Sequence, residues 1–357
     1  MRIALDAMGG DYAPAEVVQG AVLFARENPQ HEVVLVGHQR RIHEALREEL
    51  AAPGHIEVHH ASETVEMHEH PGAAIRGKKD SSIRVCFELI KAGEAAAMVS
   101  AGNSGAVMAG ALFVLGRIPS IDRPAFAALF PALKGEGRCL LLDAGANVEC
   151  KPAHLAQFAL MGEVYVRRLL GVHRPRVAIL SNGEEASKGT PLTRSALDLL
   201  RQSDLHILGY VEGKDIFSGE VEVVVTDGFT GNVVLKTSEG AATAVAGLIR
   251  SAVQQAGLSE KLGALLLKPT LAGLRKVVDY AEYGGAPVLG VAGVAIVAHG
   301  RSHARAVKNA LRTAMQACDA HFNDELGRRL HSAQSWLPAR VAKRIKGGAG
   351  TLEDASE

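Results

Sequence analysis

Residues 97–106 read AMVSAGNSGA, a short apolar run that enters a loop of glycine, asparagine and serine. The apolar run predicts a buried strand at 97–100, and the loop predicts a tight turn before a helix. Three more strand candidates enter similar loops, within 140–147, 177–189 and 221–232. In an open parallel sheet, such loops emerge at the carboxyl edge, where ligands bind. We therefore expect an α/β fold with a ligand site at one edge of its sheet.

The rest of the chain repeats this alternation of short apolar runs and segments long enough for a helix. Further strands are expected at 3–6, 33–36, 56–59, 207–211 and 288–299, the last with glycines that can break it, and Pro14 opens a helix that ends at Arg26. The intervening lengths favour parallel strands with crossover helices. We expect one domain over residues 1–333 and a partly disordered extension over 334–357.

Composition excludes several classes of protein. Lys and Arg total 39 and Asp and Glu total 39, so the zero net charge argues against a uniformly basic nucleic-acid binder. The four cysteines form no CxxC pair, which is typical of reduced, cytosolic thiols. Neither a secretory signal nor an uncharged apolar run of about 18 residues is evident, so a cytoplasmic protein is expected.

The sequence lacks several common motifs of enzymes. There is no GxxxxGKS/T, no GxGxxG after the first strand, no GxSxG and no HExxH, which argues against a standard P-loop, a dinucleotide site, an esterase elbow and a zincin. The clustered histidines are interpreted as surface residues rather than metal ligands: His55, His59, His60, His68 and His70.

Eight blocks of sequence follow one another in a distinctive order. They are DAMGGD (6–11), SAGNSGA (100–106), RPA (123–125), LDAGAN (142–147), LSNGEE (180–185) with Lys188-Gly189, VEGKDI (211–216), DGFTGNV (227–233) and YGGAP (283–287). Together these blocks resemble the PlsX family of acyl-ACP:phosphate acyltransferases, and the resemblance covers residues 1 to about 325. Ser104 and Tyr12 depart mildly from the family pattern, in which Thr and His are more frequent at these positions.

The resemblance implies a specific reaction. Such enzymes move a long-chain fatty acyl group from acyl carrier protein to inorganic phosphate, giving acyl phosphate for a membrane glycerol-3-phosphate acyltransferase of glycerophospholipid synthesis. It also implies a Rossmann-like three-layer α/β/α sandwich like phosphotransacetylases and isopropylmalate-type dehydrogenases. A homodimer in peripheral contact with the membrane is implied, with no metal or organic cofactor.

In this reaction a phosphate oxygen attacks a thioester carbonyl, so the protein must hold a dianion and stabilise an oxyanion. Lys188 is the candidate partner of phosphate or oxyanion, and Asn103 and Asn232 are candidate amide donors. His299 either protonates the leaving thiolate or serves the core or a dimer interface. Asp227 and Glu184 either orient Lys188 or cap helices. The remaining candidates for substrate binding are Gly102, Ser104, Gly105, Asn147, Asn182, Gly228, Thr230 and Gly231.

The segment 248–280 predicts an amphipathic helical hairpin interrupted at Pro269. Its leucines recur at helical spacing beside lysines and arginines, which fits either packing on the core or a second subunit, or contact with anionic lipid. The basic stretch 76–84 is either a docking face for acidic acyl carrier protein or an ordinary solvated surface.

Three other functions remain open. A phosphotransacetylase-like enzyme would use the same chemistry on a short acyl donor. An NAD-linked dehydrogenase shares the gross architecture, but the sequence shows no dinucleotide fingerprint. A non-catalytic scaffold would recruit partners of lipid synthesis to the membrane.

Overall fold

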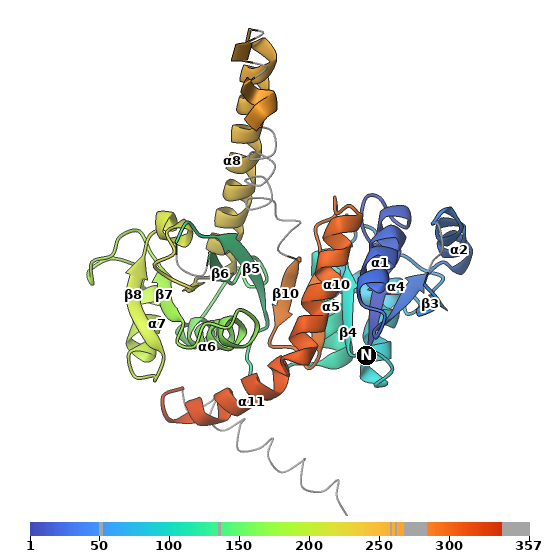
Figure 1. The fold of residues 1–357 in the computed structure, drawn as a ribbon. Helices are drawn as coiled ribbons and strands as arrows, with labels where there is room; N and C mark the ends of the chain where they lie inside the picture. The colour runs from blue at the N-terminus through green and yellow to red at the C-terminus, as the bar shows by residue number, and fades with distance from the viewer. Residues whose placement is uncertain (50–52, 135–136, 258, 261–262, 268–283, 338–357) are drawn as a thin grey trace, which may run out of the picture.

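The structure is a computed structural model, and it describes residues 1–357 apart from 50–52, 135–136, 258, 261–262, 268–283 and 338–357. In this part of the chain, strands form one sheet in the order β3-β2-β1-β4-β11-β10-β5-β6-β9-β7-β8 (Figure 1). The strands are β1 (Arg2–Asp6), β2 (Glu32–Gly37), β3 (Ile56–His60), β4 (Ala97–Ser100), β5 (Ala125–Pro131), β6 (Arg138–Leu142), β7 (Arg176–Leu180), β8 (His206–Val211), β9 (Val223–Val225), β10 (Ala286–Leu289) and β11 (Val294–Val297).

The sheet consists of two parallel blocks joined by an antiparallel seam. Strands β3, β2, β1, β4 and β11 are parallel to one another, and so are β6, β9, β7 and β8. Between the blocks, β10 is antiparallel to both β11 and β5, and β5 is antiparallel to β6. The expectation of parallel strands is therefore correct within each block and wrong at the seam. The four predicted loops do not share one edge of one parallel array.

The predicted strands are confirmed. The run 288–299 is broken at its glycines into two strands of an antiparallel hairpin, β10 and β11. Strand β5 was not predicted because its sequence, AFAALFP, is rich in alanine and lacks the β-branched residues that mark strands. The first helix, α1 (Ala15–Glu27), begins one residue after Pro14, which occupies the N-cap position.

In the first block, alternate residues of each strand enter two different cores. Ile3 and Leu5 pack against α1 and α10 (Ala304–Asp319), whereas Ala4 faces the other side. That other side is covered by α3 (Pro71–Gly77), α4 (Ser82–Lys91) and α5 (Ser104–Gly110). A smaller helix, α2 (Gln39–Glu48), lies against β3 and α1. This block is the α/β/α sandwich that the sequence predicts.

The second block buries one face of β6, β9 and β7 against α6 (Pro152–Leu169) and α7 (Pro191–Leu200). Helix α11 (Phe322–Ser332) packs on α6. The packed chain continues to Trp336 and Leu337, which are buried in the same core. These two residues fall in the stretch that the sequence assigned to the C-terminal extension, and residues 338–357 lie outside the described residues.

The longest helix, α8 (Gly228–Gln255), projects from the second block (Figure 1). Of its residues, only Gly228 and Gly231 are buried. The predicted hairpin at 248–280 thus begins as the last two turns of one long helix. Residues 263–267 are helical as well, and the remainder of the predicted hairpin, from 268, lies outside the described residues. No helix among the described residues has the length and apolar character needed to span a bilayer.

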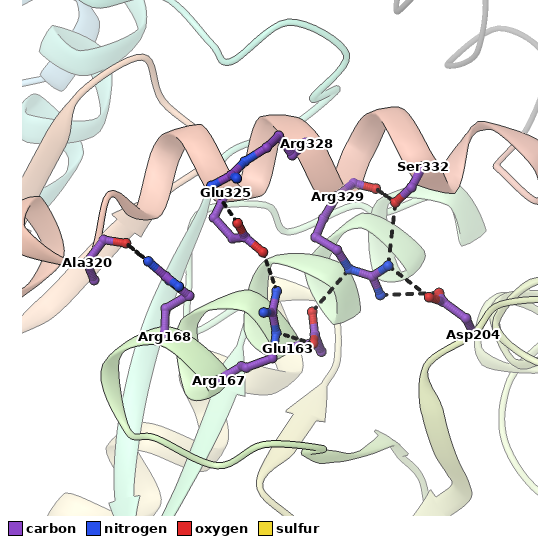
Figure 2. A network of polar contacts seen from close by, with 9 residues as sticks. All are labelled: Glu163, Arg167, Arg168, Asp204, Ala320, Glu325, Arg328, Arg329 and Ser332. Carbon is purple, nitrogen blue, oxygen red and sulfur yellow. Dashed lines mark hydrogen bonds and ion pairs between the residues drawn. The ribbon is translucent and has the colours of Figure 1, made fainter.

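A network of ion pairs and hydrogen bonds holds helix α11 against α6 (Figure 2). Helix α10 packs beside α1 in the first block, whereas α11 lies on α6 in the second. Arg167 of α6 lies between Glu163, at 2.8 Å, and Glu325 of α11, at 2.7 Å. Arg329 of α11 pairs with Asp204 at 2.8 Å. Because α10 and α11 are consecutive, this network links the two blocks.

We expect Arg167→Met to lower the free energy of unfolding by about 2 kcal/mol at pH 7, because two largely buried carboxylates lose their shared donor. The exposed side chain of Arg328 also pairs with Glu325, so Arg328→Met is the matched control and should cost less than about 1 kcal/mol. Urea unfolding measures both, and equal losses would contradict the assigned role of Arg167.

The loss of unfolding free energy caused by Arg167→Met should depend on pH. The hydrogen bond from Arg167 holds the pKa of Glu325 below its ordinary value of 4.5. Because the folded-state pKa is the lower one, this stabilisation is present above pH 4.5 and is lost as the pH falls through the folded-state pKa. The difference in free energy of unfolding between wild type and Arg167→Met should therefore become smaller as the pH falls below 4.5.

Candidate functional site

The loops that follow β1, β4 and β11 meet at the carboxyl edge of the first block. The backbone N–H of Asp11 donates to the carbonyl of Gly300 at 2.8 Å. Gly9 lies directly against Gly102, since a Cβ added at Gly9 would come within 2.7 Å of the Gly102 nitrogen. These glycines allow three loops to approach one another closely.

A buried carboxylate lies beneath these loops. Asp6 is 1% exposed and accepts hydrogen bonds from the Ser100 hydroxyl at 2.6 Å and from the Met8 N–H at 3.1 Å. Burial raises the pKa of Asp6, and the hydrogen bonds oppose that rise. The Ser100 oxygen in turn accepts the Gly102 N–H at 3.0 Å, so this predicted phosphate-binding amide is already occupied.

Asn103 is a structural residue in this arrangement. Its Oδ1 accepts the N–H of Ala106 and so caps α5, while its Nδ2 donates to the carbonyls of Glu66, Met67 and Glu69. With its amide group fully engaged, Asn103 positions the 66–69 loop, which the sequence did not suggest. Of the other residues predicted here, Gly105 packs on Pro71 and Ser104, the first residue of α5, is exposed.

A second buried carboxylate organises the carboxyl edge of the other block. Asp143 is fully buried, and its Oδ1 accepts the N–H groups of Phe126, Gly145 and Ala146 at 3.0–3.1 Å. Its Oδ2 accepts both the backbone N–H and the side-chain Nδ2 of Asn147, at 2.7 and 2.8 Å. Burial raises the pKa of Asp143, but five donors favour its ionised form.

The start of α8 is fitted against this carboxylate. The Gly228 N–H donates to the carbonyl of Asn147 at 2.7 Å, and a Cβ at Gly231 would overlap the carbonyl oxygen of Asp143. Asp227 is the N-cap, accepting the Thr230 N–H at 2.9 Å and its hydroxyl at 2.8 Å. Of the two roles considered for Asp227, the structure shows the helix cap. The residues predicted as a loop are the first turn of a helix.

Asn232 lies one turn into α8, where a Cβ at Gly145 would be 3.4 Å from its own Cβ. It is exposed, and its amide has no partner among the described residues. The Nδ2 of Asn147, in contrast, already donates to Pro124 and Asp143. Asn232 is therefore the predicted amide donor that remains available to a ligand.

Lys188 lies in the loop after β7, and β9 separates β7 from β6 in the sheet. Its stem covers Gly183, where a Cβ would lie 2.9 Å from the Lys188 Cγ. Asn182 fixes the loop by accepting the Gly189 N–H at 3.1 Å. In the described chain the Lys188 ammonium has no acceptor partner. Glu184 lies 3.8 Å from Lys214, so it does not orient Lys188.

The pKa of His299 depends on both blocks, because charged residues of α8 and of the first block influence it. Burial and then the charge of Lys236 lower its pKa, while Glu239 and Asp11 oppose that effect. Its Nδ1 accepts the N–H of Arg301 at 3.1 Å, which leaves the proton of the neutral ring on Nε2. His299 is thus mostly neutral at pH 7.

The cysteine near this edge is a poor nucleophile. Burial and the charge of Asp143 raise the pKa of Cys150 to about 12. The described residues also contain no cluster of His, Cys, Asp and Glu side chains suited to a metal ion. The predicted polar groups without a partner in the described part of the chain are instead the Lys188 ammonium and the Asn232 amide.

Comparison with known proteins agrees with this architecture. A family of proteins described as fatty acid synthesis protein matches residues 1–325. A phosphate acyltransferase of Myxococcus xanthus is 65% identical over 99% of this chain and 100% of its own, and one of Geobacter sulfurreducens is 51% identical over 93% and 95%. A phosphotransacetylase structure from Streptococcus pyogenes has a TM-score of 0.60 at 17% identity, covering 90% of this chain and 94% of its own.

The family match and the identity to curated relatives define the class: the chain is an acyltransferase. It belongs to the phosphate acyltransferase (PlsX) family. The likeness to solved structures extends to a 4-hydroxythreonine-4-phosphate dehydrogenase from Klebsiella pneumoniae, with a TM-score of 0.52 at 14% identity over 89% of this chain and 97% of its own. At such identities the likeness shows the shared fold alone.

We expect Gly231→Ala to lower the free energy of unfolding by about 1–3 kcal/mol, because the added methyl overlaps the Asp143 carbonyl. A methyl added at Gly247, in the same helix, would have nothing within 4 Å, so Gly247→Ala should gain about 0.5–1 kcal/mol. Urea unfolding compares them. A Gly231→Ala protein as stable as wild type would show that the close contact between Gly231 and the Asp143 carbonyl is not needed for stability.

Proposed function

We propose that the protein transfers a long-chain acyl group from acyl carrier protein to inorganic phosphate and releases acyl phosphate for glycerophospholipid synthesis. The observation that carries the proposal is the pair of unengaged donors, Lys188 and Asn232, at the carboxyl edge of one parallel block. The N-terminus of α8 lies at the same edge and adds its positive dipole end, which favours an anion. Asn182 fixes the loop that carries Lys188, and Asp227 with Asn147 fixes the start of α8 that carries Asn232.

The reaction then needs positioning and electrostatic stabilisation more than covalent catalysis. A phosphate oxygen forms a bond to the thioester carbon, and the carbon–sulfur bond breaks. Lys188 offsets the phosphate charge, and the Asn232 amide donates to the oxyanion. Hydrogen phosphate loses its proton as the carrier sulfur gains one, so the proton that the leaving group needs comes from the phosphate itself. The Nδ1 of His299 already accepts the Arg301 N–H, so the proposal does not use this ring nitrogen as the base.

The proposal extends to a homodimer in the cytoplasm that contacts the membrane peripherally. Helix α8 exposes Val233, Val245, Leu248 and Ile249, and beyond it Leu265, Leu266 and Leu267 are each more than half exposed. Exposed apolar side chains on a projecting element are typical of an interface with a second subunit or with lipid.

The basic stretch 76–84 gives less support for carrier docking. Lys78 pairs with Glu69 and Arg84 with Glu88, while Arg76 lies over the ring of Phe113. These partners reduce the net positive charge that the sequence suggested for this face. We therefore leave the docking face of acyl carrier protein unassigned.

We expect wild-type protein to release free carrier thiol from palmitoyl-acyl carrier protein only when phosphate is present, with acyl phosphate as product. Lys188→Ala should lower kcat/KM by roughly 10²–10³, the usual cost of one aimed donor. Lys214→Ala removes a neighbouring lysine that pairs with Glu212, and it should keep the wild-type rate. Release from acetyl-CoA but not from palmitoyl-acyl carrier protein would favour a short-chain phosphotransacetylase.

Membrane contact is tested by flotation with anionic liposomes. Leu265→Glu/Leu266→Glu should abolish flotation, because each buried leucine contributes roughly 1.5–3 kcal/mol to lipid binding. Leu133 is 89% exposed in the turn between β5 and β6, so Leu133→Glu is the control and should float like wild type. Flotation of the double variant at the wild-type level would remove the membrane from the proposal.

A further inference from the structure

A groove of about 1000 Å³ runs between α8 and the segment that follows β11. Phe130 and Phe217 line it, with ring centroids 5.7 Å apart in an edge-on contact. Leu235, Ala242 and Ala246 of α8 also line it. The groove therefore has apolar side chains from β5, from the turn before β9 and from α8.

Small residues of α8 give the groove its width. Residues 235, 239, 242 and 246 recur at helical spacing and so lie on one face of α8. Beyond Glu239, α8 lines the groove with small residues, Gly240, Ala242, Thr243, Ala244 and Ala246, which leave open space beside the helix. The one hydroxyl among them, that of Thr243, donates to the carbonyl of Glu239. From 235 to 246 the face is about 16 Å long, from the rise of 1.5 Å per residue. An extended chain of roughly a dozen methylenes has this length, from ordinary carbon–carbon bonds.

The groove is continuous with the candidate active site. Leu235 and Lys236 follow Asn232 by one helical turn, and His299 itself lines the groove. Beside His299, the Ser302 hydroxyl is buried without a hydrogen-bond partner in the described part of the chain. Lys236 and Arg301 add positive charge near the same residues. The groove thus has polar groups near His299 and small apolar ones further along α8.

We propose that this groove binds the acyl chain of the thioester donor. The carbonyl lies beside Asn232 and His299, and the chain runs along α8 past Ala242 to Ala246. This inference rests on the proposed acyl transfer and assigns the residues that select chain length. A polar head next to reactive groups and an apolar tail in a groove match the chemistry of a fatty acyl thioester. Each methylene buried there should improve binding roughly fourfold.

Bulky residues in the groove test the proposal. Ala242 and Ala246 are exposed on α8, so Ala242→Phe and Ala246→Phe project a ring into the groove without entering the core. Ala241 is exposed on the same helix but does not line the groove, which makes Ala241→Phe the matched control. The assay is phosphate-dependent kcat/KM with butyryl-, octanoyl-, dodecanoyl- and palmitoyl-acyl carrier protein.

We expect Ala246→Phe to lower kcat/KM for the palmitoyl donor at least tenfold and to leave the butyryl donor within twofold of wild type. Ala242→Phe, nearer Asn232, should affect the octanoyl donor as well, while Ala241→Phe should keep the wild-type profile. Equal losses for all donors, an unchanged profile, or the same profile in Ala241→Phe would overturn the proposal. So would a change of oligomeric state in sedimentation with no change in the profile, because a second copy would then occupy the groove.

A binding measurement separates this proposal from the proposed reaction. The fluorescent fatty acid cis-parinaric acid should bind the wild-type protein, and Ala246→Phe should weaken its binding at least tenfold while Ala241→Phe does not. If wild type binds the probe but transfers no acyl group to phosphate, the reaction is wrong and the groove stands. If transfer occurs and neither substitution changes probe binding or chain-length preference, the groove is wrong and the reaction stands.

Discussion

The geometry of the candidate site depends on one buried carboxylate, that of Asp143. It has no solvent contact and accepts five hydrogen bonds, from the start of β5, from its own loop and from both nitrogens of Asn147. Asn147 in turn accepts the first amide of α8 through its carbonyl. A buried charge is tolerated only when donors compensate it, so β5, the loop and α8 must take up these relative positions together.

The first block contains a similar buried and hydrogen-bonded carboxylate, that of Asp6. The sequences Leu5-Asp6-Ala7 and Leu142-Asp143-Ala144 are alike, and each aspartate ends a buried strand and accepts an amide two residues ahead. The two sites differ in what lies above them. The Asp6 site is closed by Gly9, Gly102 and Asn103, whose polar groups are engaged within the protein. The Asp143 site leaves Asn232 unengaged, so the ligand is expected there.

The sequence predicts most of the fold but only part of the site. Strands such as β1 and β4 are short buried runs flanked by glycine, a local pattern. The seam depends on pairing between residues far apart in sequence, such as Phe126 with Val288, which no local pattern encodes. The contacts of Asn103 were not predicted for the same reason, because its three acceptors lie more than thirty residues away. Asp6 and Asp143 lay within the recognised blocks, yet only burial and donor geometry reveal their role.

The seam explains how the proposed phosphate site and the apolar groove can share one helix. Because β10 and β5 run antiparallel between the blocks, the segment after β11 faces α8, and residues of both line one groove. The N-terminus of α8 is fixed by Asp143 and carries the positive dipole end, whereas its middle is free of the core and carries alanine. The proposed acyl thioester donor would need both environments close together. Helix α8 packs on the core at its N-terminus and projects from it further along, so one helix provides both the polar and the apolar environment.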